Sequence, residues 1–156
     1  MIEYLQKAGK FEDQEGNSRS VASHFFEIEF QERLKNLDLP EEEEKVSLSH
    51  SLKLGCTIGG QIDLKIKNLN EGIHAYLNGS VEKTSPIDGQ LHSYSKHSEI
   101  NSLPPYLIVQ KVRFFWKEAN ELSGTKATNT KITKPVDFGL SLDLFQFCSP
   151  TLKEKL

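Results

Sequence analysis

The chain is short of the residue types that mark several functional classes. It has two cysteines, Cys56 and Cys148, among 156 residues. Two cysteines cannot build a disulfide framework, and they cannot supply a four-ligand zinc ribbon without help from scattered histidines. A reducing setting, cytoplasmic and nuclear, fits this cysteine usage best. We therefore expect no structural metal and no cofactor.

Basic clusters and long apolar runs are also missing. The 19 Lys and Arg residues are scattered along the chain, and the formal net charge is −3. Nucleic-acid binding depends on clustered positive charge that displaces counterions, so we expect no nucleic-acid partner. No run approaches the roughly 18 apolar residues of a membrane helix, and the N-terminus lacks the pattern of a secretion signal, so we expect no membrane partner.

Hydrophobic residues make up only 37% of the chain. This fraction is low for a compact globular protein, and a segment cut from a larger core would have it too. At the other end, Ser149 followed by Pro150 is a cap and first-position signal for a helix, and the chain stops at Leu156 within that helix. We therefore expect an incomplete domain.

Alternation of apolar and polar residues predicts strands in several places. The clearest run extends over 46–58, with Leu54, Cys56 and Ile58 on its apolar face, and the alternation resumes over 62–66. Gly59-Gly60 lies between the two runs, and glycine permits a positive φ at both positions of a tight turn. The pattern therefore predicts a β-hairpin with one apolar face.

Other elements follow from local signals. Asn70, ahead of an apolar stripe at helical spacing, predicts a helix to about Lys83. The stretch from Tyr106 to Trp116 is apolar without alternation, which is typical of a central strand buried on both faces. The remaining expected elements are a helix remnant and polar linker over 1–20, a helical turn over 21–26 capped by Ser20, a strand through 26–30, a solvated acidic loop at 41–44, a turn at 85–89, a strand over 90–100, a long loop over 118–131 and a strand over 136–144.

The residues that could carry chemistry do not form a recognisable catalytic group. Cys56 falls on an apolar strand face, where burial raises the pKa of a thiol and makes it inert. Cys148 precedes a helix start that could lower its pKa, but no histidine base is identified for it, so we expect ordinary packing. His92 and His97 are five residues apart on one strand, hence on opposite faces, and cannot close on one metal ion. We assign no catalytic residue.

Four short stretches carry a family resemblance. They are residues 24–30 (HFFEIEF), 82–86 (EKTSP), 103–118 (LPPYLIVQKVRFFWKE) and 140–152, which contains LSLDL and CSP. The third stretch is similar to the L-P-x-x-L-x-x-x-x-x-R-F pattern of ubiquitin-specific cysteine proteases, and all four, in this order, resemble the proteasome-associated branch of that family. The resemblance covers roughly residues 20–156.

The resemblance implies an α+β fold, the papain-like hand of thumb, palm and fingers, with a mainly antiparallel sheet and a few helices. Such enzymes use Cys, His and Asp or Asn to cleave the isopeptide bond after the C-terminal glycine of ubiquitin. Neither the Cys box nor the His box has a match here, so residues 21–156 would be the fingers and part of the palm. The implied partners are ubiquitin and the proteasome regulatory particle. Many relatives carry a zinc ribbon in the fingers, although this branch looks zinc-free, and Phe138-Gly139 departs from the usual aromatic residue followed by Pro.

The resemblance also points to a ubiquitin-contacting segment. In this branch the loop after the Arg-Phe strand can cover the groove that receives the ubiquitin tail, and here that loop is about Arg113 to Lys131. Arg113, Phe115 and Trp116 are the expected ubiquitin-binding residues, whereas Phe114 is expected to pack in the core. Two hypotheses follow: a fragment of a deubiquitinase that is inactive alone, or a complete non-catalytic module that binds ubiquitin or acts as a decoy.

Overall fold

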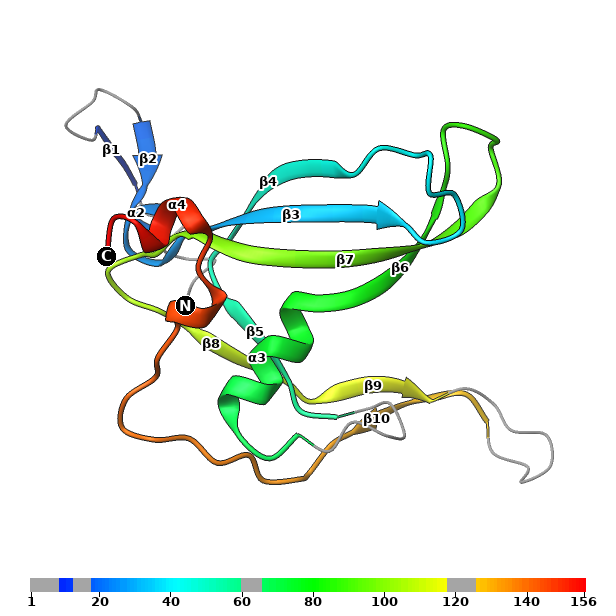
Figure 1. Cartoon of the computed structure of the whole chain (residues 1–156). Coiled ribbons are helices and arrows are strands. Elements are labelled where there is room, and N and C mark those ends of the chain that lie inside the picture. The colour runs from blue at the N-terminus through cyan, green and yellow to red at the C-terminus, as the bar shows by residue number, and fades with distance from the viewer. Residues whose placement is uncertain (1–8, 13–17, 60–65, 118–125) are drawn as a thin grey trace.

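The computed structural model of the chain describes residues 9–12, 18–59, 66–117 and 126–156. Its largest element is a four-stranded antiparallel sheet with the strand order β4-β3-β7-β6 (Figure 1). The strands are β3 (Ile28–Asn36), β4 (Lys45–Ser51), β6 (Asn78–Thr84) and β7 (Leu91–Ser102). The fold is therefore α+β with a mainly antiparallel sheet, as the resemblance implied.

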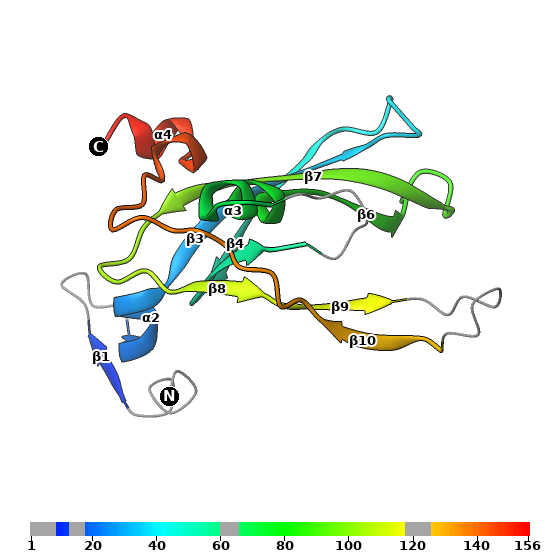
Figure 2. The ribbon, with the colours of Figure 1, turned by 90° about the horizontal axis from the view of Figure 1, so that it is seen from below.

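Most of the smaller elements gather near one end of this sheet (Figures 1 and 2). Strands β5 (Leu54–Thr57) and β8 (Val109–Val112) form a parallel pair, and β9 (Phe114–Lys117) pairs antiparallel with β10 (Thr128–Lys131). The helices are α2 (Val21–Phe26), α3 (Leu69–Leu77) and α4 (Pro150–Lys153), with a 3-10 turn η2 (Phe145–Phe147). Among the described residues, no helix has the length and apolar character needed to cross a membrane.

The hydrophobic core lies where α3 and β5 meet the end of the four-stranded sheet. Ile28, Leu54, Ile73 and Ile100 are fully buried there. The helix approaches the strand so closely that glycines are needed in both elements. A Cβ atom added at Gly72 of α3 would lie 2.5 Å from the carbonyl oxygen of Thr57 and closer still to the sulfur of Cys56, and one added at Gly55 of β5 would collide with the Tyr76 ring.

Local signals in the sequence are confirmed where the chain forms caps and turns. The Ser20 side chain accepts a hydrogen bond from the Ser23 amide at the start of α2, and Ser149 caps α4 with Pro150 in its first turn. The turn at 85–89 is present, with Gly89 at φ +71°. Strand β7 covers the predicted stretch 90–100, and Ile28 and Phe30 point into the core from β3.

The helix predicted to extend to Lys83 ends earlier. Its N-cap is Asn68 instead of Asn70, and it stops at Leu77, after which Asn78–Thr84 forms β6 and pairs with β7. Gly79 explains why the helix does not continue, because a glycine in a helix interior is about 1 kcal/mol less favourable than an alanine. The ladder with β7 then replaces the helical hydrogen bonds, and Val81, expected on the helix stripe, is exposed on an edge strand.

The alternating run over 46–58 is two strands and not one. The chain bends at Leu52 and Lys53, so β4 pairs with β3 whereas β5 pairs in parallel with β8. Leu54, Cys56 and Ile58 are buried as predicted, but Val46 and Leu48 are exposed. The predicted hairpin partner falls mostly on residues 60–65, outside the described part of the chain.

Two further strand predictions are wrong. Tyr106 to Trp116 is not a single strand buried on both faces, because β8 has a hydrogen-bonded neighbour only in β5 among the described strands, and Tyr106 and Val112 are exposed. Residues 136–144 are irregular, with only Asp137 bridging to Asn68, and Leu140 is fully exposed. Val136 alone in that stretch is buried, so its alternation does not reflect one buried face.

The N-terminal region contains more order than a linker. Where polar residues suggested a linker, β1 (Lys10–Glu12) and β2 (Ser18–Ser20) form a short antiparallel pair that leads into α2. The helix remnant predicted at the start of the chain falls on residues 1–8, which lie outside the described residues.

Candidate functional site

The segment expected to contact ubiquitin forms a β-hairpin. Strand β9 pairs antiparallel with β10, with Trp116 opposite Asn129 and Phe115 opposite Thr130. The hairpin extends from the core toward the same side as the free end of the four-stranded sheet (Figure 1). Of the long loop predicted over 118–131, the part Thr128–Lys131 is a strand, and residues 118–125 lie outside the described part of the chain.

Arg113 lies at the base of this hairpin, between β8 and β9. Its carbonyl oxygen accepts a 2.7 Å hydrogen bond from the Ile132 amide, and its guanidinium donates to the Ile132 carbonyl oxygen at 3.3 Å. The residue is half-buried. Both contacts hold the segment after β10 against the start of β9, so Arg113 positions the hairpin.

The prediction for Phe114 is wrong, and those for its neighbours remain predictions. Phe114 is 63% exposed and does not pack in the core. The strand is short and has one described partner, so alternate side chains meet solvent instead of a second layer. The side chains of Phe115 and Trp116 lie outside the described part of the structure, so the structure brings only the backbones of these two residues next to Arg113.

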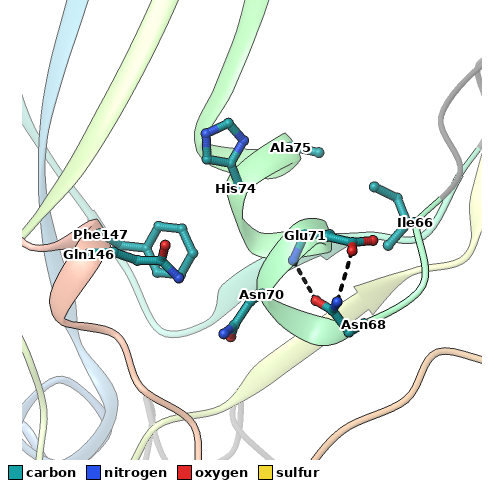
Figure 3. A pocket seen from close by; sticks show the side chains of 8 residues that line it. All are labelled: Ile66, Asn68, Asn70, Glu71, His74, Ala75, Gln146 and Phe147. Atoms are coloured by element: carbon teal, nitrogen blue, oxygen red, sulfur yellow. Dashed lines mark hydrogen bonds between the residues drawn. The ribbon is translucent and has the colours of Figure 1, made fainter.

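A pocket of about 610 Å³ lies beside α3, far from this hairpin in sequence (Figure 3). Asn70 and His74 line it from α3, and Gln146 and Phe147 line it from η2. Phe147 is buried and the three polar residues are exposed. Their amide and imidazole groups can donate and accept hydrogen bonds, and neither of the two cysteines lines the pocket.

The carboxylate in this pocket serves the helix start. The Glu71 side chain accepts from the Lys67 amide at 2.7 Å and from the Asn68 side chain at 2.9 Å, while Asn68 accepts from the Glu71 amide (Figure 3). Hydrogen bonds, led by the one from the Lys67 backbone, lower the pKa of the Glu71 carboxyl. A carboxylate held anionic in a reciprocal cap is a poor general base. The Asn-x-x-Glu spacing was visible in the sequence and would have located this cap.

Both thiols are unsuited to nucleophilic attack. Cys56 and Cys148 are buried, and their thiols donate to backbone carbonyl oxygens. Burial raises the pKa of both thiols above the ordinary value. The suggestion that the helix start lowers the pKa of Cys148 is therefore wrong, since Lys153 favours the thiolate but loss of solvent outweighs it. Within the described residues, no three His, Cys, Asp or Glu side chains are grouped to hold a metal ion.

Comparison with known proteins shows the family to which the chain belongs. The family model described as ubiquitin carboxyl-terminal hydrolase matches residues 1–156, and the chain belongs to that family. A chain of a yeast SAGA DUBm structure superposes with a TM-score of 0.57 at 19% identity, covering 85% of this chain and 28% of that one. The fold is thus that of the ubiquitin-specific proteases.

Curated relatives are longer than this chain. Ubiquitin carboxyl-terminal hydrolase 6 of Arabidopsis thaliana is 41% identical over 132 residues, which cover 84% of this chain and 25% of the relative. Hydrolase 6 of Schizosaccharomyces pombe is 37% identical over 121 residues, and hydrolase 14 of Caenorhabditis elegans is 31% identical over 131 residues. The chain therefore spans about a quarter of the length of these relatives, 24–25% in each case.

Proposed function

We propose that this chain is part of a thiol-dependent deubiquitinase that removes ubiquitin from proteasome-bound conjugates, by hydrolysing the isopeptide bond after the C-terminal glycine of ubiquitin. The family match over residues 1–156 is the observation that carries the proposal. The chain spans about a quarter of its relatives and both of its thiols are buried, so we assign the cleavage chemistry to the rest of a longer protein. The role of this segment is to hold ubiquitin.

The contact with ubiquitin is assigned to the β9–β10 hairpin, through Arg113, Phe115 and Trp116. Arg113 supplies a half-buried guanidinium at the base of the hairpin, which is a fitting donor for carbonyl or carboxylate oxygens of a peptide tail. Phe115 and Trp116 occupy adjacent positions of β9, where they pair with Thr130 and Asn129 of β10. The proposed setting is cytoplasmic and nuclear, with the proteasome regulatory particle as a further partner of the whole protein.

Trp116 should report ubiquitin binding, because it is the single tryptophan of the chain. Titration with ubiquitin should shift its emission to shorter wavelength as water leaves the indole, with a Kd of about 10–1000 μM, equivalent to roughly 4–7 kcal/mol. Ubiquitin that lacks its last residues should produce a smaller shift. The measurement is fluorescence emission with ubiquitin alone as the blank.

The matched control is Trp116→Phe, which should remove the signal while calorimetry or NMR still detects binding. Binding of both forms of ubiquitin without any change in Trp116 emission would place the tail away from this hairpin. Failure of ubiquitin to bind at millimolar concentration would overturn the gripping role itself.

A second candidate is a complete, non-catalytic module that binds ubiquitin or acts as a decoy. The buried thiols, whose pKa values are raised, favour it, because such groups contribute no nucleophile of their own. The two functions are distinguished by the longer gene product. Hydrolysis of a ubiquitin–fluorophore conjugate by that product, and not by this chain, would support the enzyme, whereas inhibition of another deubiquitinase by this chain would support the decoy.

A further inference from the structure

The end of the four-stranded sheet opposite the core is closed by interacting side chains. The β3–β4 connection, residues 37–44, and the β6–β7 turn, residues 85–90, lie next to each other there (Figure 1). Seven side chains from these two connections and their flanking strands interact with one another, although the two connections are far apart in sequence. We call these side chains the end clasp. They are Asn36, Asp38, Glu42, Ser85, Asp88, His92 and Tyr94.

Glu42 is the centre of one half of the end clasp. Its carboxylate accepts hydrogen bonds from the Asn36 amide at 2.6 Å, the Ser85 hydroxyl at 2.8 Å and the Tyr94 hydroxyl at 2.9 Å. These three donors are almost completely buried, at 1–3% exposure. Hydrogen bonds, first from Asn36, lower the pKa of the Glu42 carboxyl. The acidic loop is therefore not simply solvated, and Glu42 is the member of the run that sequence reasoning missed.

His92 bridges the other half. Its Nε2 atom lies 2.7 Å from Asp88 Oδ2 in the β6–β7 turn, and its Nδ1 atom lies 3.4 Å from Asp38 Oδ2 in the β3–β4 connection. Asp38 also accepts from the Ser93 amide at 2.9 Å. The imidazole is mostly shielded, with 14% of its side chain exposed. One histidine thus spans two connections that are far apart in sequence.

This bridge needs a proton. A neutral imidazole has one N–H and one lone pair, so it can donate to only one carboxylate and turns a lone pair toward the other. An imidazolium donates from both nitrogens. We propose that the end clasp is a proton-operated latch, in which protonated His92 ties the β3–β4 connection to the β6–β7 turn and deprotonated His92 releases Asp38. The latch is independent of the assignment of a ubiquitin contact.

The surrounding charges set the direction of the switch. The charged groups around His92 are the carboxylates of Asp38, Asp88 and Glu42, while Lys83 of β6 pairs with His92 and places its ammonium over the Tyr94 ring. The hydrogen bond to Asp88, ahead of the other contributions, raises the pKa of His92. Because the folded-state pKa of His92 is raised, protonation of His92 stabilises the latch fully below about pH 6.5. This stabilisation is lost as pH rises through the pKa of folded His92.

At low pH the end clasp also weakens, because its carboxylates become protonated. The pKa of Asp88 is lowered, chiefly by the hydrogen bond from the Gln90 amide, as is that of Glu42. Their stabilisation is present above the unfolded pKa and disappears as pH falls through the folded one. The end clasp is therefore tightest in a mildly acidic window. A pocket of about 680 Å³ lies between the two connections, with Leu34, Glu43 and Ile87 in its wall, and Glu42 of the end clasp also lines it.

An NMR titration of the whole chain tests the latch. The His92 ring should titrate with a pKa above the ordinary value of about 6.5. Asp38→Asn and Asp88→Asn should each lower that pKa. Exchange of the Ser93 and Leu37 amides, corrected for intrinsic rates, should accelerate at least about tenfold between pH 6 and pH 8.5 as the hydrogen bonds that join the β3–β4 connection to Ser93 of β7 open.

His97→Phe is the matched control, since His97 lies on the same strand but on the opposite face and contacts Asn78. His92→Phe should abolish the pH-dependent part of the exchange, whereas His97→Phe should leave it intact. A His92 pKa at or below about 6.5 in the unmodified chain would overturn the proposal. So would corrected exchange rates at Ser93 that stay constant from pH 6 to pH 8.5, a result that requires no variant to fold.

Discussion

Gly72→Ala should unfold the chain or come close to doing so. Alanine normally favours a helix over glycine by about 1 kcal/mol, so a helix taken alone would gain from the change. Here the new methyl group would meet the Thr57 carbonyl oxygen at 2.5 Å and the Cys56 sulfur, both of which are part of β5. Overpacking of this kind costs about 1–3 kcal/mol and more when backbone must move. We expect a net loss of about 3 kcal/mol in the free energy of unfolding, measured by urea denaturation.

Gly79→Ala is the control for that experiment. Gly79 is also a glycine next to α3, but a Cβ atom there has no neighbour within 4 Å and its φ is not positive. Since glycine in a strand interior is unfavourable by roughly 0.5–1 kcal/mol, Gly79→Ala should leave stability unchanged or raise it slightly. Equal stability of the Gly72 and Gly79 variants would mean that α3 does not pack directly on β5.

The sequence predicts this fold well where local chemistry decides. Ser20, Ser149 with Pro150, and Gly89 each define a cap or a turn within four residues, and each is found as predicted. Strand β3 begins within the alternating stretch 26–30, and Ile28 and Phe30 are buried as the alternation predicts. In these places the free energy depends on neighbours along the chain, which a sequence displays directly.

Long-range pairing is where sequence reasoning fails. Alternation over 46–58 shows that the chain is extended, but it does not show that β4 and β5 join different sheets or that β5 pairs in parallel with β8. The same limit explains Gly79, where a ladder with β7 overrides a helical stripe. Tertiary context decides such cases, and period-2 or period-3.6 patterns contain no information about the partner.

The same contrast between local signals and long-range contacts applies to the candidate site. Arg113 was found through a family resemblance, and the structure places it at the base of a hairpin. Glu42 was interpreted as one of four solvated glutamates, because its partners Ser85 and Tyr94 are 43 and 52 residues away. Phe114 is the aromatic residue of this segment that we expect in the core, yet it is exposed. A single sequence identifies residue chemistry, but not which distant groups meet.

The two thiols should be almost unreactive in the folded chain. Each is buried against a backbone carbonyl oxygen and its pKa is raised by burial, so little thiolate forms and none of it meets reagent without local opening. An opening free energy of about 3 kcal/mol slows the reaction roughly 100-fold. Alkylation at pH 7.5, followed by mass spectrometry, should therefore be at least about 100-fold slower in native buffer than in guanidinium, where both cysteines react.

Variants in which one cysteine is replaced show which thiol reacts and whether either thiol contributes to activity. Cys56→Ala and Cys148→Ala should each leave one slow thiol, and neither should change the activity of the isolated chain toward a ubiquitin–fluorophore conjugate, which we expect to be absent. Cys148 is the more stringent test of low reactivity, because it precedes a helix and lies next to the positive charge of Lys153. Fast labelling confined to Cys148, or turnover that Cys148→Ala removes, would show that this thiol reaches solvent as thiolate and would return it to the position of a nucleophile.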